Sequence, residues 1–217
     1  MPDGARLRLV QRGDEFTILL DRTELMSTRA STSERALATM TVDRLAGRPA
    51  PDLLIGGYGM GYTLRAALAV LPGDASVTMA ELVPEIVAWA RGPMHRLTAG
   101  CLDDPRVLLV GDDVAMLIDA ARGGYDAILL DVDNGPEGLT RIINDDLYSA
   151  QGLQAARTAL KPGGVLAVWS AFPDEAFTTR LLDAGFDLTE SIVKEGGDDD
   201  EAHHVIWFAQ RPLDDPA

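Results

Sequence analysis

Several features are scarce in this chain of 217 residues, and each shortage excludes a class of protein. A single cysteine, Cys101, rules out an internal disulfide and is typical of the reducing cytoplasm, where we expect the protein. No apolar run reaches about 18 residues and the N-terminus has no apolar signal segment, so we expect neither membrane insertion nor secretion. The 19 basic residues are outnumbered by 34 acidic ones, and the net charge of −15 argues against nucleic acid and favours a cationic small molecule.

The first 50 residues predict a short appendage to one main domain. Two apolar segments, 7–10 and 16–20, flank a turn-like sequence at Gly13 and predict a β-hairpin. Ser31, Thr32 and Ser33 then offer an N-cap for a helix that we expect to run to about Ala46. We therefore divide the chain into an appendage, a cofactor-binding domain and a frayed tail, at residues 1–50, 51–211 and 212–217.

Strand and helix patterns alternate from residue 52 onward. The expected strands lie at 53–55, 77–80, 107–110, 127–130, 165–169, 186–193 and 205–209. The expected helices lie at 63–71, 84–91, 114–121, 150–160 and 174–184. The first five strands are continuous apolar runs, as in sheets covered on both faces. This order predicts an α/β fold, a doubly wound, mostly parallel, seven-stranded Rossmann-like sheet with an antiparallel C-terminal edge hairpin.

Ligands of such sheets bind where the strands end, and the first strand ends in a glycine-rich turn. Gly57, Gly59 and Gly61 precede a helix whose N-terminus favours a negative group. Their spacing departs from the dinucleotide-binding fingerprint, so a purely structural turn remains an alternative.

Acidic residues follow the next three strands. Glu81, with Leu82 beside it, stands where a carboxylate can accept hydrogen bonds from both ribose hydroxyls of an adenosine cofactor; alternatively, it only favours a helix dipole. Asp112, with Asp113 beside it, could accept from an adenine amino group or serve as an N-cap. Asp131 opens the loop after the fourth strand. Together, these strand ends predict one nucleotide-cofactor crevice.

From residue 52 to residue 169 the chain resembles the spermidine synthases, which have the class I AdoMet-dependent methyltransferase fold. The matching stretches include LLIGGYGMGYTLRAAL, AELVPEIVAWAR and YDAILLDVDNGPEG. The resemblance implies S-adenosylmethionine or its decarboxylated form as cofactor, a small amine or hydroxyl acceptor, and a homodimer. It places the donor's tail at Gly57, Gly59 and Gly61, the ribose at Glu81, the adenine at Asp112 and the catalytic aspartate at Asp131. Further cofactor-binding candidates are Leu82, Asp113 and Asp131 itself.

The chain also departs from the family pattern on the substrate side. Gly59 replaces an aspartate that grips the donor's amino group, and Asn134 stands at the second aspartate of the catalytic loop. Met26 and Arg35 fall nearest to a substrate-side glutamine and tyrosine. These departures remove residues that bind the polyamine and keep those that bind the nucleoside.

The expected chemistry is in-line attack on a carbon attached to a sulfonium, with donor and acceptor held about 3–3.5 Å apart. Asp131 is the first choice to orient the acceptor and take its proton, ahead of Tyr148 and Asp133. A purely electrostatic role for Asp131 is an equal alternative. We expect methyl transfer slightly ahead of aminopropyl transfer, with a non-catalytic nucleoside-binding module as a third hypothesis. No metal site is expected, because His203 and His204 have no accompanying ligand pattern.

Overall fold

The structure is a computed structural model. It describes residues 6–132, 135–136, 146–195 and 203–214. Two residues named from the sequence, Asp133 and Asn134, lie outside the described residues, and the expected tail is described as far as residue 214.

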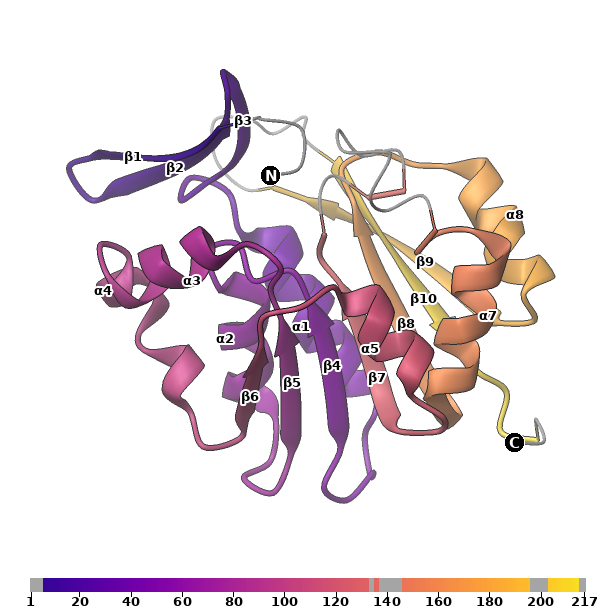
Figure 1. The fold of residues 1–217 in the computed structure, drawn as a ribbon. Coiled ribbons are helices and arrows are strands. Elements are labelled where there is room, and N and C mark those ends of the chain that lie inside the picture. The colour runs from indigo at the N-terminus through magenta and orange to yellow at the C-terminus, as the bar shows by residue number, and fades with distance from the viewer. Residues whose placement is uncertain (1–5, 133–134, 137–145, 196–202, 215–217) are drawn as a thin grey trace.

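The N-terminal segment forms a small antiparallel sheet, with strand order β1-β2-β3. Its strands are β1 (Leu7–Arg12), β2 (Glu15–Leu20) and β3 (Thr23–Ser27). The hairpin expected from the sequence corresponds to β1 and β2, whereas β3 was missed because its pattern is short and polar. Figure 1 shows this sheet at the end of the molecule where α3 and α4 begin, away from the strands of the main sheet.

The main sheet has seven strands in the order β6-β5-β4-β7-β8-β10-β9. They are β4 (Asp52–Gly56), β5 (Ser76–Ala80), β6 (Val107–Val110), β7 (Tyr125–Leu130), β8 (Leu160–Ser170), β9 (Asp187–Lys194) and β10 (His203–Gln210). Strands β4 to β8 pair in parallel, and β10 runs antiparallel to both β8 and β9. The predicted fold class is therefore confirmed. The chain reverses its direction of strand addition between β4 and β7, which is where ligands bind in such folds.

Helices cover both faces of the sheet (Figure 1). They are α1 (Thr32–Arg44), α2 (Tyr62–Val70), α3 (Pro84–Arg91), α4 (His95–Thr98), α5 (Val114–Ala120), α7 (Ala150–Ala159) and α8 (Glu175–Asp183). One apolar cluster includes Leu37 and Leu64 from α1 and α2, and the other includes Ile118 and Phe177 from α5 and α8. The short α4 was not expected. Within the described ranges, no helix combines the length and apolarity needed to cross a bilayer.

Candidate functional site

The glycine turn joins β4 to α2 at the switch point of the sheet. Gly57 and Gly61 have positive φ angles of 86° and 76°, which side chains rarely adopt. A Cβ added at Gly57 would lie 2.1 Å from the backbone oxygen of Asp131, and one at Gly61 would lie 2.7 Å from the Tyr58 hydroxyl. The protein's own packing therefore requires both glycines, and the turn lies directly against the end of β7.

Gly59 lies under the N-terminal sheet. Its φ angle is 52°, and a Cβ there would lie 2.7 Å from Met26 Sδ of β3. Where the family pattern has an acid, this protein therefore has Gly59, and the thioether of Met26 packs against the glycine backbone. The ungapped sequence comparison placed Met26 near a substrate-side glutamine, but the fold brings it onto the glycine turn.

Glu81 follows β5, is only 8% exposed and links the glycine turn to α3. Its Oε2 accepts a hydrogen bond from the Tyr58 amide at 2.9 Å, and its Oε1 accepts from the Val83 amide at 2.8 Å. Burial raises the pKa of Glu81, while these amide hydrogen bonds oppose the shift. Each carboxylate oxygen has further acceptor capacity, which a ribose hydroxyl could use. The adjacent Leu82 is 52% exposed and offers apolar surface.

Asp112 and Asp113 lie between β6 and α5. Asp113 is the N-cap, because its carboxylate accepts from the Ala115 amide at 2.9 Å. Asp112 is exposed, and its Oδ1 accepts from the Asp113 amide at 2.8 Å. The N-cap role considered for Asp112 therefore belongs to its neighbour.

Asp131 stands at the carboxyl end of β7, as the strand order requires. Its amide donates to the Gly56 carbonyl at 2.9 Å, and its Oδ2 accepts from Thr63 Oγ1 of α2 at 2.5 Å. Burial raises the pKa of Asp131 to about 6, against the opposing effect of the Thr63 hydrogen bond. Within the described part of the chain, no cationic side chain forms an ion pair with this carboxylate.

A second acid, the buried Glu34, lies near Asp131 and was missed in the sequence. Thr63 Oγ1, which donates to Asp131 Oδ2, also lies 3.4 Å from the Glu34 carbonyl oxygen. Glu34 lies in the first turn of α1 and is 8% exposed. Burial first, and then the charge of Asp131, raise the pKa of Glu34 to about 7. The sequence offered no distinguishing signal, because many helices have an acid in their first turn.

The start of α1 is bound to the C-terminal hairpin. Glu195 accepts from the amides of Thr32 at 3.1 Å and Ser33 at 2.8 Å, and from Ser33 Oγ at 2.7 Å. Glu195 therefore caps α1, whereas Ser31, at the N-cap position, makes no side-chain capping bond. The expectation of a local cap was wrong, because the carboxylate of Glu195, distant in sequence, accepts the hydrogen bonds of the free amides instead. His204 Nδ1 lies 2.9 Å from Ser33 Oγ.

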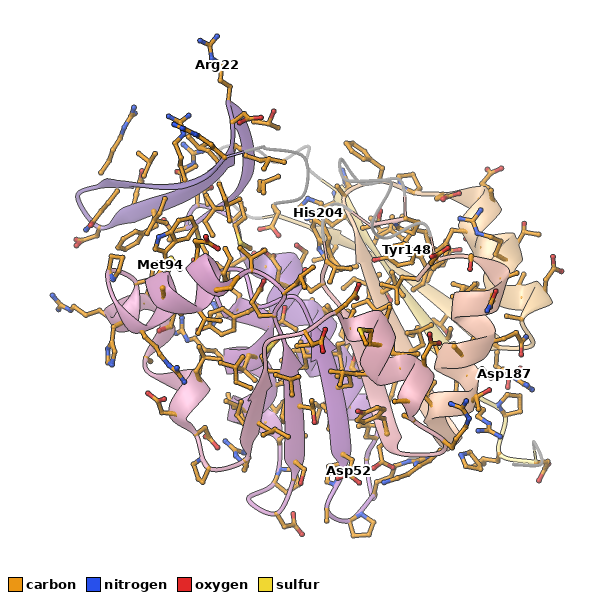
Figure 2. The ribbon with its side chains drawn as sticks, in the orientation of Figure 1. Arg22, Asp52, Met94, Tyr148, Asp187 and His204 are labelled. Atoms are coloured by element: carbon orange, nitrogen blue, oxygen red, sulfur yellow. The ribbon has the colours of Figure 1, made fainter. Side chains whose placement is uncertain are left out.

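The other catalytic candidate that the structure describes, Tyr148, lies elsewhere. It is buried beneath α7 and α8, with its ring edge-on to Phe177 at a centroid distance of 5.6 Å. Figure 2 shows Tyr148 beside α7, while His204 lies nearer the N-terminal sheet. Asp131 contacts Thr63 on the opposite face of the main sheet. The described residues include no group of three or more His, Cys, Asp or Glu side chains arranged to hold a metal ion.

Comparison with known proteins gives two kinds of match, in sequence and in structure. The polyamine aminopropyltransferase of Mycobacterium tuberculosis is 30% identical over 168 residues, which are 76% of this chain and 31% of the relative. Putrescine N-methyltransferase 4 of Nicotiana tabacum is 36% identical over 119 residues, which are 54% of this chain and 29% of the relative. The solved spermidine synthase of Thermotoga maritima superposes with a TM-score of 0.76 over 98% of this chain and 70% of its own, at 20% identity.

The chain resembles the spermidine synthases. The resemblance inferred from the motifs is thereby confirmed, and the fold is the spermidine synthase fold. The chain spans about a third of the length of the first curated relatives that it matches. No family model matches this spermidine synthase-like chain.

Proposed function

We propose that this chain transfers a group from an AdoMet-type sulfonium donor to a small cationic amine. The observation that supports the proposal best is the pair of carboxylates on either side of the switch point. Glu81 adjoins the glycine turn after β5, and Asp131 adjoins the same turn after β7. One acid can hold the ribose of the donor, and the other can meet the acceptor next to the donor's sulfur.

In this mechanism the amine attacks a carbon of the sulfonium, an N–C bond forms, and the C–S bond breaks to release a neutral thioether. Asp131 orients the amine and accepts its proton. The raised pKa of Asp131, about 6, makes it a stronger base than an ordinary aspartate and keeps it largely ionised at neutral pH. Thr63 fixes the carboxylate by its hydrogen bond. An electrostatic role for Asp131 would use the same geometry without the proton transfer.

We propose a methyl group as the group transferred, and an aminopropyl group as the second candidate. Methyl transfer is favoured by Gly59 and Met26, because an apolar surface stands where an acid would repel the carboxylate of intact AdoMet. Aminopropyl transfer is favoured by the sequence match to the mycobacterial aminopropyltransferase, which extends over 76% of this chain.

The charge distribution supports a cationic acceptor. Residues 1–46 contain seven arginines and seven acidic residues, so the whole net charge of −15 lies in the sheet domain. A field of this sign attracts cations to the crevice. We propose the cytoplasm as the compartment, because Cys101 is a buried free thiol.

The test is calorimetric titration with AdoMet, decarboxylated AdoMet and 5′-methylthioadenosine, followed by transfer assays with di- and polyamines. We expect all three nucleosides to bind and neither donor to be preferred by as much as about a hundredfold, which is ~2.7 kcal/mol. A larger preference for the decarboxylated donor would put aminopropyl transfer first. Binding without transfer to any acceptor would favour a non-catalytic module, and no binding would contradict the proposal.

A further inference from the structure

We propose that Glu34 and Asp131 together bind one alkylammonium group of the substrate, and that Glu34 gives up a proton when this cation arrives. The inference rests on the proposed function and specifies which side chains recognise the amine. It adds Glu34, from the appended N-terminal segment, to a site otherwise built from the ends of the sheet strands.

The first support is that neither acid has a positively charged partner among the residues that the structure describes. Glu34 is 8% exposed, and Asp131 accepts its described side-chain hydrogen bond from the neutral hydroxyl of Thr63. The described residues provide neither acid with an ion pair to lysine, arginine or histidine. Two neighbouring acids, one buried and one partly buried, are unfavourable when both are ionised and no cation lies near them. A ligand ammonium supplies the missing charge.

The second support comes from the hydroxyl of Ser33, which has one proton and three partners. Ser33 Oγ lies 2.7 Å from Glu195 Oε1, 2.9 Å from Glu34 Oε2 and 2.9 Å from His204 Nδ1. One hydroxyl can donate once and accept twice. If it donates to Glu195, both remaining contacts need a proton on the partner. The geometry is satisfied when His204 donates from Nδ1 and Glu34 donates as a neutral carboxylic acid.

The other charges around Glu34 agree with this assignment. Glu195 is held ionised, because hydrogen bonds from Ser33 and Thr32 outweigh burial and lower its pKa. Burial lowers the pKa of His204 despite the nearby Glu195, so its ring stays neutral at pH 7. Burial first, and then the charge of Glu34, raise the pKa of the Tyr62 hydroxyl. With anionic Glu195 and Asp131 on either side, Glu34 is the acid that holds the proton in the empty site.

A third support is an unused donor on the same face of the sheet. Trp169 at the end of β8 is 9% exposed, and its Nε1 has no hydrogen-bond partner among the residues that the structure describes. Its ring lies 4.9 Å from the ring of His204 and belongs to the same apolar cluster as Leu37 of α1. A buried donor without an acceptor indicates a place for a ligand or water atom, and an indole face also favours a nearby cation.

The experiment compares Glu34→Gln with wild type in titrations with putrescine, AdoMet, decarboxylated AdoMet and 5′-methylthioadenosine, which has no ammonium group. Putrescine is titrated with and without saturating methylthioadenosine. We expect the variant to bind at least one ammonium-bearing ligand about tenfold or more weakly, the effect of a hydrogen bond to a charged group. Methylthioadenosine should bind equally well. A loss confined to putrescine assigns the acceptor's ammonium, and a loss confined to the donors assigns the donor's.

A second readout uses the wild-type protein. Binding of the ammonium-bearing ligand at pH 7 should release up to about one proton, seen as a dependence of the binding enthalpy on buffer ionisation. Glu34→Gln should abolish most of that release. Glu175→Gln is the matched control, because Glu175 also lies in the first turn of a helix, α8, but is exposed. The control should change neither affinity nor proton release.

Three results would overturn the inference. They are equal affinity of wild type and Glu34→Gln for every ammonium-bearing ligand, an equal loss for methylthioadenosine, and no proton release on binding. The proposed function fails separately, if methylthioadenosine and both donors do not bind. In that case putrescine binding with Glu34-dependent proton release would still support the ammonium site.

Discussion

The two ends of β7 present an instructive comparison, because each end has a buried or partly buried aspartate. Asp126, at the start of the strand, is 4% exposed and accepts from Arg48 at 2.6 Å and from Lys161 at 2.8 Å. Asp131, just past the end, accepts from the Thr63 hydroxyl. Burial alone would raise both pKa values, yet that of Asp126 is lowered by its partners and that of Asp131 is raised to about 6.

The difference separates two uses of a charge in the same strand. Asp126 links the start of β7 to Arg48 before β4 and to Lys161 at the start of β8, and it also accepts from the amide of Asp52, the first residue of β4, at 2.9 Å. Its charge is fully compensated inside the protein, and it needs no ligand. At Asp131 the described residues provide no such cation, and Glu34 adds a second acid nearby. Uncompensated charge that the fold tolerates at a switch point indicates a binding or catalytic role.

The largest effect should come from replacing Asp131. Asp131→Asn keeps an acceptor for Thr63, so the fold and nucleoside affinity should remain nearly intact. Turnover should fall about 10²–10⁴-fold, the usual range for a positioned proton acceptor. The measurement is a steady-state assay with the amine found by screening. Turnover at the wild-type rate would make Asp131 a structural residue, and proton removal would then belong to Tyr148, Asp133 or water.

The partner experiment at the other end of β7 is Asp126→Asn. It leaves Arg48 and Lys161 without their shared anion, and we expect the free energy of unfolding to fall by roughly 1–3 kcal/mol. This loss of stability should be smaller than for the removal of one partner from a fully buried ion pair, because the side chains of Arg48 and Lys161 are partly exposed. Urea denaturation at pH 8 measures it. Equal destabilisation by Asp131→Asn would remove the distinction between the two ends.

Glu81 tests the nucleoside half of the crevice. Glu81→Ala should weaken methylthioadenosine binding by about 1.5–3 kcal/mol, because the ribose hydroxyls lose a charged acceptor. Titration calorimetry measures the change, and a denaturation curve checks that the glycine turn survives without the two amide contacts. Unchanged affinity would show that the ribose is held elsewhere and would undermine the assignment of the crevice.

The smallest effect concerns the pH dependence of stability in the ligand-free protein. Glu34 and Asp131 have raised pKa values, so between about pH 4 and pH 7 the folded state binds more protons than the unfolded state, and stability falls as pH rises. Glu34→Gln should therefore be more stable than wild type at pH 8, by roughly 1–3 kcal/mol at about 1.4 kcal/mol per pKa unit. The gain should disappear near pH 4.

The contribution of Asp126 to stability depends on pH with the opposite sign. Its pKa is lowered in the folded state, so its charge stabilises the fold at pH values above the unfolded-state pKa, and this stabilisation is lost on acidification. Unfolding curves at pH 4 and pH 8 therefore separate the two acids. A Glu34→Gln protein that is less stable than wild type at pH 8 would show that the ionised Glu34 is compensated, contrary to the structure described above.

The sequence by itself determined the sheet, its two helical layers and the acids at its strand ends. Apolar runs within single segments predicted the strands, and the alternation of strands and helices predicted a doubly wound, mostly parallel sheet. Glu81 and Asp131 could be found because each directly follows a strand, so their place in the fold is fixed by local sequence. The glycine turn could be located in the same way.

Only the tertiary structure decided how the N-terminal segment completes the crevice. Glu195 reaches Ser33 across 162 positions in the chain, Met26 packs on Gly59, and Glu34 lies near Asp131, with Thr63 Oγ1 between them. No local pattern distinguishes these residues from an ordinary loop acid, strand methionine or helix acid. Their chemistry arises because α1 packs with its first turn over the strand ends, where burial removes water from Glu34 and places it against a second carboxylate.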